Sequence, residues 1–179
     1  MSQDKVSQIL ALRVLTLLAG TVNASLDKFS GWLMVGTGGA FSLLLTNIEK
    51  LVGFVNAGSI RFALSLMLVS LAVGVIAKFL SAMISASVAS NDAAFAVGKD
   101  AVKDGFTIDI EAYLIEFKRG LFFVQRLVAE TSFKKLRAGD LAAGGRLVAK
   151  LSQVNVWIVL FQAILILWSA VEILVGVKI

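Results

Sequence analysis

The sequence predicts an all-α, multi-pass helical membrane protein with three transmembrane helices, an N-terminal amphipathic or interfacial helix and a cytoplasmic helical segment. Three uncharged stretches support this fold class: 29–48, 62–77 and 151–171. A bilayer core about 30 Å thick is crossed by roughly 20 apolar helical residues, so each stretch is a candidate span. The 179-residue chain is also 58% hydrophobic, with a mean hydropathy of +0.89, well above that of typical soluble domains. We place the three spans at 29–53, 59–85 and 151–177.

The first 28 residues contain an apolar run, 9–20, with Arg13 in its middle. An arginine near the centre of a span costs about 2.5–3.5 kcal/mol on insertion scales. We therefore expect residues 1–28 to form a helix in the cytoplasmic interface, with Arg13 and Lys5 at the headgroups. A tilted or re-entrant helix packed on the bundle is the alternative. A cleaved signal peptide is disfavoured, because the first residues carry balanced charge and cleavage would reverse the topology.

The distribution of basic residues predicts the topology. Residues 85–150 contain ten Lys or Arg side chains, whereas the loop 49–61 contains only two. Basic segments stay in the cytoplasm, so we expect residues 86–150 and the N-terminus inside and the C-terminus outside. The expected location is an integral position in a bacterial inner membrane.

Each span carries a stripe of small or polar residues at spacings that share one helix face. The candidates for helix packing or pore lining are Gly31, Gly38, Ser42, Ser70, Gly74, Ser81, Asn155, Gln162, Ser169 and Glu172. In lipid, small residues let helix backbones approach and polar side chains hydrogen-bond across the contact, so we favour packing. A water-filled path is the alternative, and it requires several copies because three spans are too few to enclose a pore.

Glu172 lies near the expected outer end of the third span. An ionisable group within a membrane is by default a candidate functional site. Because its depth is shallow, we favour anchoring at the interface or pairing with Lys178 over an ion or proton site.

The segment 86–150 is expected to be helical. One helix is expected to open at Asp92, and Thr107 is the expected N-cap of a basic amphipathic helix spanning 107–137. The apolar stripe of this second helix must be covered by the preceding helix, by another subunit or by the membrane surface. Residues 138–140, Ala-Gly-Asp, are expected to end it.

Basic side chains dominate the second half of this segment. The candidates for contact with anionic lipid or a partner are Lys118, Arg119, Arg126, Lys134, Lys135, Arg137, Arg146 and Lys150. Each gains roughly 1 kcal/mol near an anionic leaflet, so we favour membrane lipid, with a protein partner at helix 107–137 as a further candidate. Nucleic acid is not expected, because no nucleic-acid-binding motif accompanies the charges.

The composition argues against enzymatic chemistry. The chain has no cysteine and no histidine, which removes the commonest nucleophile, base and metal ligands. We expect no catalytic residue, cofactor or metal.

Two functions fit the sequence. The first is an inner-membrane protein that self-associates through its small-residue helix faces into a membrane-permeating or membrane-signalling homo-oligomer. The alternative is a non-catalytic accessory or scaffold subunit that anchors a larger membrane complex through its cytoplasmic helix.

Overall fold

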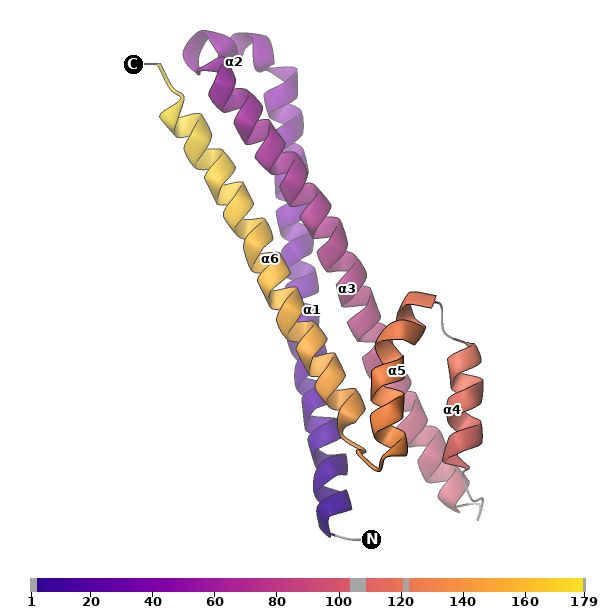
Figure 1. The fold of residues 1–179 in the computed structure, drawn as a ribbon. Coiled ribbons are helices and arrows are strands. Elements are labelled where there is room, and N and C mark those ends of the chain that lie inside the picture. Colours follow the sequence, from indigo (N-terminus) through magenta and orange to yellow (C-terminus); the bar gives the residue numbers. More distant parts are fainter. Residues whose placement is uncertain (1–2, 104–108, 121–122, 179) are drawn as a thin grey trace. The chain divides into compact units, whose positions relative to one another are not determined.

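A computed structural model describes residues 3–103, 109–120 and 123–178, and all of its named elements are helices (Figure 1). They are α1 (Gln3–Thr46), α2 (Ile48–Phe54), α3 (Ala57–Lys103), α4 (Ile110–Arg119), α5 (Phe123–Arg137) and α6 (Ala143–Val175). The predicted all-α class is confirmed for these residues. Helices α1, α3 and α6 are each long and apolar enough to cross a membrane. Their insertion into one remains a prediction.

Two expected helix boundaries are absent. Helix α1 runs without a break through residue 28, so the N-terminal segment is not a separate helix. Helix α3 likewise continues through Asp92, where a new helix was expected to open. The physical reason is that nothing ends either helix: the chain has no proline, so no residue removes a backbone donor at these positions.

The first span ends earlier than expected. Helix α1 stops at Thr46, Asn47 forms a turn, and α2 follows as a short separate helix. Beyond α2, the chain is tied to the C-terminal tail. The Asn56 N–H donates to the Gly176 carbonyl at 2.7 Å, and the Lys178 N–H donates to the Phe54 carbonyl at 2.8 Å.

The predicted helix 107–137 is two helices. Helix α4 is capped by Asp109, whose carboxylate accepts from the N–H groups of Glu111 at 2.9 Å and Ala112 at 3.2 Å. The expected cap, Thr107, lies outside the described residues. Helix α4 ends at Gly120, whose N–H turns back to the Phe117 carbonyl. Glycine gives little support to a helix interior, which explains why the amphipathic pattern does not continue as one helix.

The predicted break after α5 is confirmed at Gly139. This glycine has φ +87°, a left-handed conformation that favours glycine over all other residues. Its N–H donates to the Leu136 carbonyl at 2.9 Å, and the Asp140 N–H donates to the Lys135 carbonyl at 3.0 Å. This pair of hydrogen bonds is a Schellman motif, which satisfies carbonyls that the helix end leaves open.

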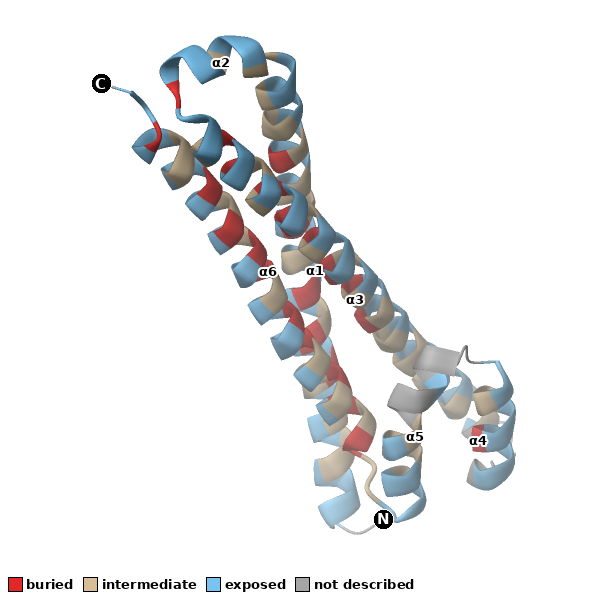
Figure 2. Ribbon diagram, turned by 45° about the horizontal axis from the view of Figure 1, so that its top comes forward, coloured by how far each residue is buried: buried red, intermediate tan, exposed pale blue. Residues whose placement is uncertain are grey.

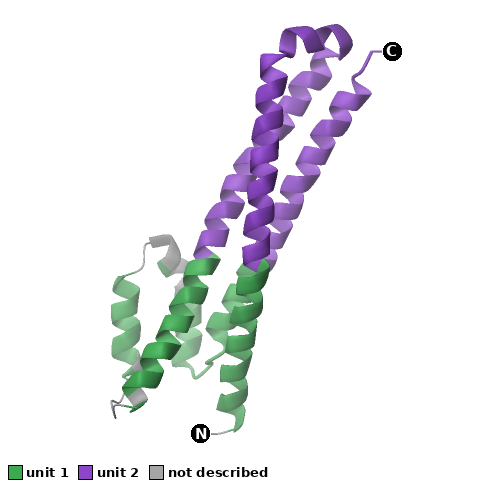
Figure 3. Ribbon diagram, turned by 180° about the vertical axis from the view of Figure 1, so that it is seen from behind, with its two compact units in different colours: residues 1–22, 84–152 green, residues 23–83, 153–179 purple. Residues whose placement is uncertain are grey.

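The chain divides into two compact units (Figure 3). Unit 1 comprises residues 1–22 and 84–152, and unit 2 comprises residues 23–83 and 153–179. Helices α1, α3 and α6 contribute residues to both.

Unit 2 buries polar side chains and exposes large apolar ones, the reverse of a soluble protein. Its buried positions are rich in small and polar side chains, and they recur as a stripe along α6 (Figure 2). Large apolar side chains such as Trp32, Leu68 and Leu174 are more than half exposed. Lipid accepts such side chains freely, while polar groups must pair inside the protein. The distribution therefore fits a unit that sits in a bilayer.

Unit 1 packs α4 and α5 beside the ends of the long helices. Gly145 lies against α1 so closely that a Cβ there would come within 2.9 Å of the Leu12 carbonyl oxygen. Leu114 of α4 is buried, and the rings of Phe117 and Phe133 meet edge to face with centroids 6.0 Å apart. The apolar side of α4 is thus covered within unit 1 itself. Leu121 and Phe122 of the expected helix 107–137 also lie outside the described residues.

Candidate functional site

The polar residues of α6 lie inside unit 2. Asn155, Gln162 and Ser169 follow at intervals of seven, and each is fully buried. Helices α1 and α3 supply the partners of the first two. The candidates that this stripe contributed are therefore brought together by packing within one chain.

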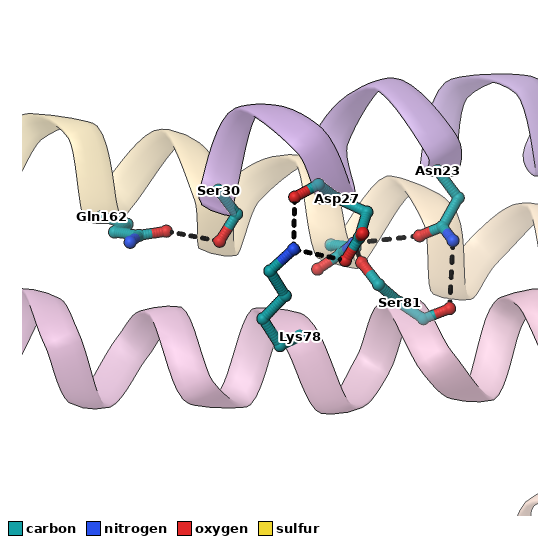
Figure 4. A network of polar contacts seen from close by, with 7 residues as sticks. Asn23, Asp27, Ser30, Lys78, Ser81 and Gln162 are labelled. Atoms are coloured by element: carbon teal, nitrogen blue, oxygen red, sulfur yellow. Dashed lines mark hydrogen bonds and ion pairs between the residues drawn. The ribbon is translucent and has the colours of Figure 1, made fainter. Parts of the chain in front are cut away.

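The first polar layer joins three helices through Asn155. Its amide nitrogen donates to Asn23 Oδ1 at 3.2 Å and to Ser81 Oγ at 2.9 Å. The amide of Asn23 in turn donates to the backbone carbonyl of Ser81 at 3.0 Å (Figure 4). Asn155 Oδ1 has no hydrogen-bond partner among the described residues. This layer links α1, α3 and α6 at one level.

A second layer surrounds Gln162. Ser30 donates to its Oε1 at 2.9 Å (Figure 4). Ser70 donates to the Gln162 backbone carbonyl at 3.3 Å. Gln162 Nε2 has no partner in the described part of the chain. It lies over Gly74, where an added Cβ would stand only 2.6 Å away. Gly74 is therefore the residue that lets the glutamine side chain lie between the helices.

An ion pair accompanies the two layers. Lys78 Nζ lies 2.8 Å from Asp27 Oδ1 and donates to the Asp27 backbone carbonyl at 2.6 Å (Figure 4). Both side chains are partly exposed, at 36% and 44%. Gly31, a predicted packing residue, makes room for this lysine, because a Cβ there would lie 3.1 Å from Nζ.

The predicted stripe of α1 needs correction. Gly38 has nothing within 4 Å of an added Cβ, and Ser42 is exposed, with its hydroxyl donating to the Gly38 carbonyl. The buried polar residues of this helix are Thr16, Asn23, Ser30 and Thr37, which also follow at intervals of seven. Asn23 and Asp27 were missed because residues 1–28 were assigned to the interface. The seven-residue period was the signal that could have found them.

Glu172 does not pair with Lys178. It accepts from the indole N–H of Trp168 at 3.4 Å, while Lys178 Nζ donates to the Val52 carbonyl at 2.9 Å. The backbone carbonyl lies nearer the tail than the carboxylate does, because the tail turns toward the α2–α3 connection.

The basic cluster is partly neutralised. Ion pairs join Lys118 to Glu130 at 2.8 Å, Arg119 to Glu116 at 2.6 Å, Arg137 to Glu111 at 3.1 Å, and Arg146 to Asp140. The Lys118 ammonium, by hydrogen bond and charge, lowers the pKa of Glu130 from 4.5. Arg126, Lys134, Lys135 and Lys150 are exposed and make no ion pair among the described residues. These four are the cations left for lipid or a partner.

The described residues include no group of three or more carboxylates that could hold a metal ion. No family model, curated protein or solved structure matches this chain.

Proposed function

We propose that this chain is a non-catalytic integral membrane protein that self-associates through one face of α1. The observation that carries the proposal is open space over the glycines of residues 36–39, of which Gly36 and Gly39 lie on one face of the helix. An added Cβ at Gly36, Gly38 or Gly39 would meet nothing within 4 Å, whereas Gly74, Gly145 and Gly176 are each filled by a neighbour. Small residues at the surface of a spanning helix let a second helix approach closely.

The shape of this face supports the proposal. Gly36 and Gly39 are exposed between the large side chains of Trp32, Val35 and Leu43, which are 76%, 71% and 68% exposed. Positions 32, 36, 39 and 43 share one side of a helix. The glycines therefore form a shallow floor between ridges, which a helix from a second copy fits.

The polar stripe of α6 gives less support to a permeating oligomer. Asn155 and Gln162 already bond to α1 and α3 of the same chain. Lining a water-filled path would require them to leave those partners. Association through α1 leaves the polar layers closed, which favours a signalling or structural assembly over conduction.

The scaffold alternative is supported by a smaller surface. The α4–α5 pair covers Leu114, and its exposed apolar side chains include Tyr113 and Ile115 at 44% and 45%. A partner that binds there meets these residues together with the four unpaired cations.

The test compares the mass of the purified protein with that of two variants. Gly36→Leu/Gly39→Leu fills the floor at positions where an added Cβ meets nothing within 4 Å, so the variant should fold but associate at least about tenfold more weakly. Gly53→Leu is the matched control, because Gly53 is equally open but lies in α2. Light scattering in detergent measures the masses.

An oligomeric native protein and control with a monomeric double variant support the proposal. A monomeric native protein contradicts it. Recovery of the chain with a stoichiometric second protein from native membranes, rather than with itself, supports the scaffold alternative.

A further inference from the structure

A pocket of about 650 Å³ lies between α1 and α3 in unit 1. Helix α1 lines it from Arg13 to Thr21, and α3 lines it from Val88 to Lys99. The two helices are antiparallel here, because Arg13 contacts Phe95 and Gly20 contacts Val88. The pocket is separate from the polar layers of unit 2 and from the basic cluster of α4 and α5.

The pocket is polar at one end and apolar at the other. Arg13, Lys99 and Asp92 supply the charged groups of its wall. Leu17, Gly20 and Val88 form the other end, which closes where an added Cβ on Gly20 would come within 3.3 Å of Val88 Cγ1. Along both helices the apolar end is the one nearer the long uncharged stretches. The polarity thus runs in the same direction as that of a lipid molecule in a leaflet.

The charged end carries one excess positive charge, and the guanidinium of Arg13 is restrained by an aromatic ring. Arg13 lies with its guanidinium carbon 4.8 Å from the centre of the Phe95 ring, a cation–π contact that restrains it. The single negative charge of Asp92 offsets one of the two positive charges in this count. Arg13 and Lys99 make no ion pair among the described residues. Guanidinium and ammonium groups with free N–H donors are typical ligands of phosphate oxygens.

Thr16 forms part of the pocket wall but offers it no hydrogen-bond donor. It lies one helical turn from Arg13, and its side chain is only 4% exposed. Its hydroxyl has no hydrogen-bond partner in the described part of the chain and is enclosed by protein atoms. The polar contacts that the pocket offers a ligand therefore come from its charged side chains.

We propose that this pocket binds one anionic phospholipid, with its phosphate held by Arg13 and Lys99 and an acyl chain along Leu17 and Val88. Basic pockets between spanning helices are known sites for anionic headgroups. The inference rests on the proposed membrane placement but not on self-association through α1.

The test measures lipid binding by native mass spectrometry of the full chain released from detergent. Phosphatidylglycerol is the probe and phosphatidylcholine the neutral comparison. The native protein should retain one phosphatidylglycerol at least tenfold more tightly than phosphatidylcholine. Arg13→Gln/Lys99→Gln should lose at least tenfold in phosphatidylglycerol affinity. Lys28→Gln/Lys50→Gln removes the same charge from exposed positions on α1 and α2 and should change it less than twofold.

Three outcomes overturn the proposal: equal losses in the two double variants, equal binding of the two lipids, or displacement of the lipid by millimolar inorganic phosphate. If the Arg13/Lys99 variant fails to fold, Lys99→Gln alone decides, because Lys99 is exposed on α3. This single change should weaken phosphatidylglycerol binding about threefold, and unchanged binding overturns the assignment.

The same samples separate this inference from the proposed function. Arg13→Gln/Lys99→Gln should keep the oligomeric mass of the native protein, and Gly36→Leu/Gly39→Leu should keep the bound lipid.

Discussion

Gly74 shows how one missing side chain determines the position of a polar group. Gln162 Nε2 and Met34 Cγ would stand 2.6 Å and 2.7 Å from a Cβ on Gly74, distances that real Cβ atoms do not tolerate. The glutamine side chain is also held by the hydrogen bond that its Oε1 accepts from Ser30, while Ser70 donates to the Gln162 backbone carbonyl. The side chain therefore cannot withdraw from an added methyl group without breaking its contact to α1.

We predict that Gly74→Ala destabilises the protein by about 1–3 kcal/mol, the usual range for overpacking a tight interior. The matched control is Gly38→Ala, since both glycines are helical but Gly38 has open space above it. The control should be neutral or slightly stabilising because alanine favours helix. Reversible denaturation in mixed micelles measures both. Equal effects of the two changes would contradict this assignment of Gly74.

At the level of elements, the periodicity of α6 predicted its buried face correctly because nothing interrupts it. From residue 154 to residue 171, Asn155, Gln162 and Ser169 are the only serine, threonine, asparagine or glutamine residues, and they share one side of the helix. Helix α1 was harder, since Arg13 and Asp27 made its first half resemble an interfacial segment. Asp27 becomes compatible with the bundle through Lys78, which lies 51 residues away in the sequence. Local composition contains no information on that pairing.

The α4–α5 pair illustrates a different limit. The amphipathic pattern of 107–137 was correct, but one glycine converted a single helix into two helices that pack on each other. The ion pairs Lys118–Glu130 and Arg137–Glu111 then join residues that a single helix would have kept apart. Spacing within a helix predicts which side chains share a face, but not where the chain folds back.

We predict that the Glu130 carboxylate titrates below 4.5 in the native protein, because Lys118 stabilises its charged form. A group whose folded pKa is depressed stabilises the fold above its unfolded pKa. The α4–α5 contact should therefore be fully formed above pH 4.5 and weaken as the pH falls through the lower, folded pKa. Carbon-13 NMR of the carboxyl group measures the midpoint.

Lys118→Gln is the variant that tests the cause of this shift. It should return the Glu130 midpoint toward 4.5, whereas Lys150→Gln, remote in the sequence and on α6, should leave it unchanged. A midpoint that does not move in Lys118→Gln would show that the ion pair is not formed in solution.

For the whole molecule, the proposed membrane placement predicts on which side of the membrane each terminus lies. Three crossings put the termini on opposite sides, and the basic residues between α3 and α6 favour the cytoplasm for the N-terminus. The chain contains no cysteine, so a single introduced cysteine reports its own position without background.

We predict that a membrane-impermeant maleimide labels Lys178→Cys but not Gln3→Cys in intact cells, and labels both after lysis. Labelling of both variants in intact cells, or of neither, would contradict three crossings. Labelling of Gln3→Cys alone would keep the number of crossings and reverse the orientation.

The positions of the polar residues in the sequence also determine the order in which the polar contacts can form during synthesis. Lys78 follows Asp27 by 51 residues in the sequence, and Gln162 follows Ser30 by 132 residues. When α1 and α3 have emerged from the ribosome, the ion pair and the Asn23–Ser81 bond can already form, but Ser30 and Asn23 Oδ1 still lack the amides of α6. The pair α1–α3 is thus an intermediate in which the two polar layers are incomplete. Helix α6, the last helix to be made, supplies the remaining hydrogen-bond partners. A truncated chain that ends before α6 would lack the amides that bond to Ser30 and Asn23 Oδ1, so we expect it to be less stable than the full chain.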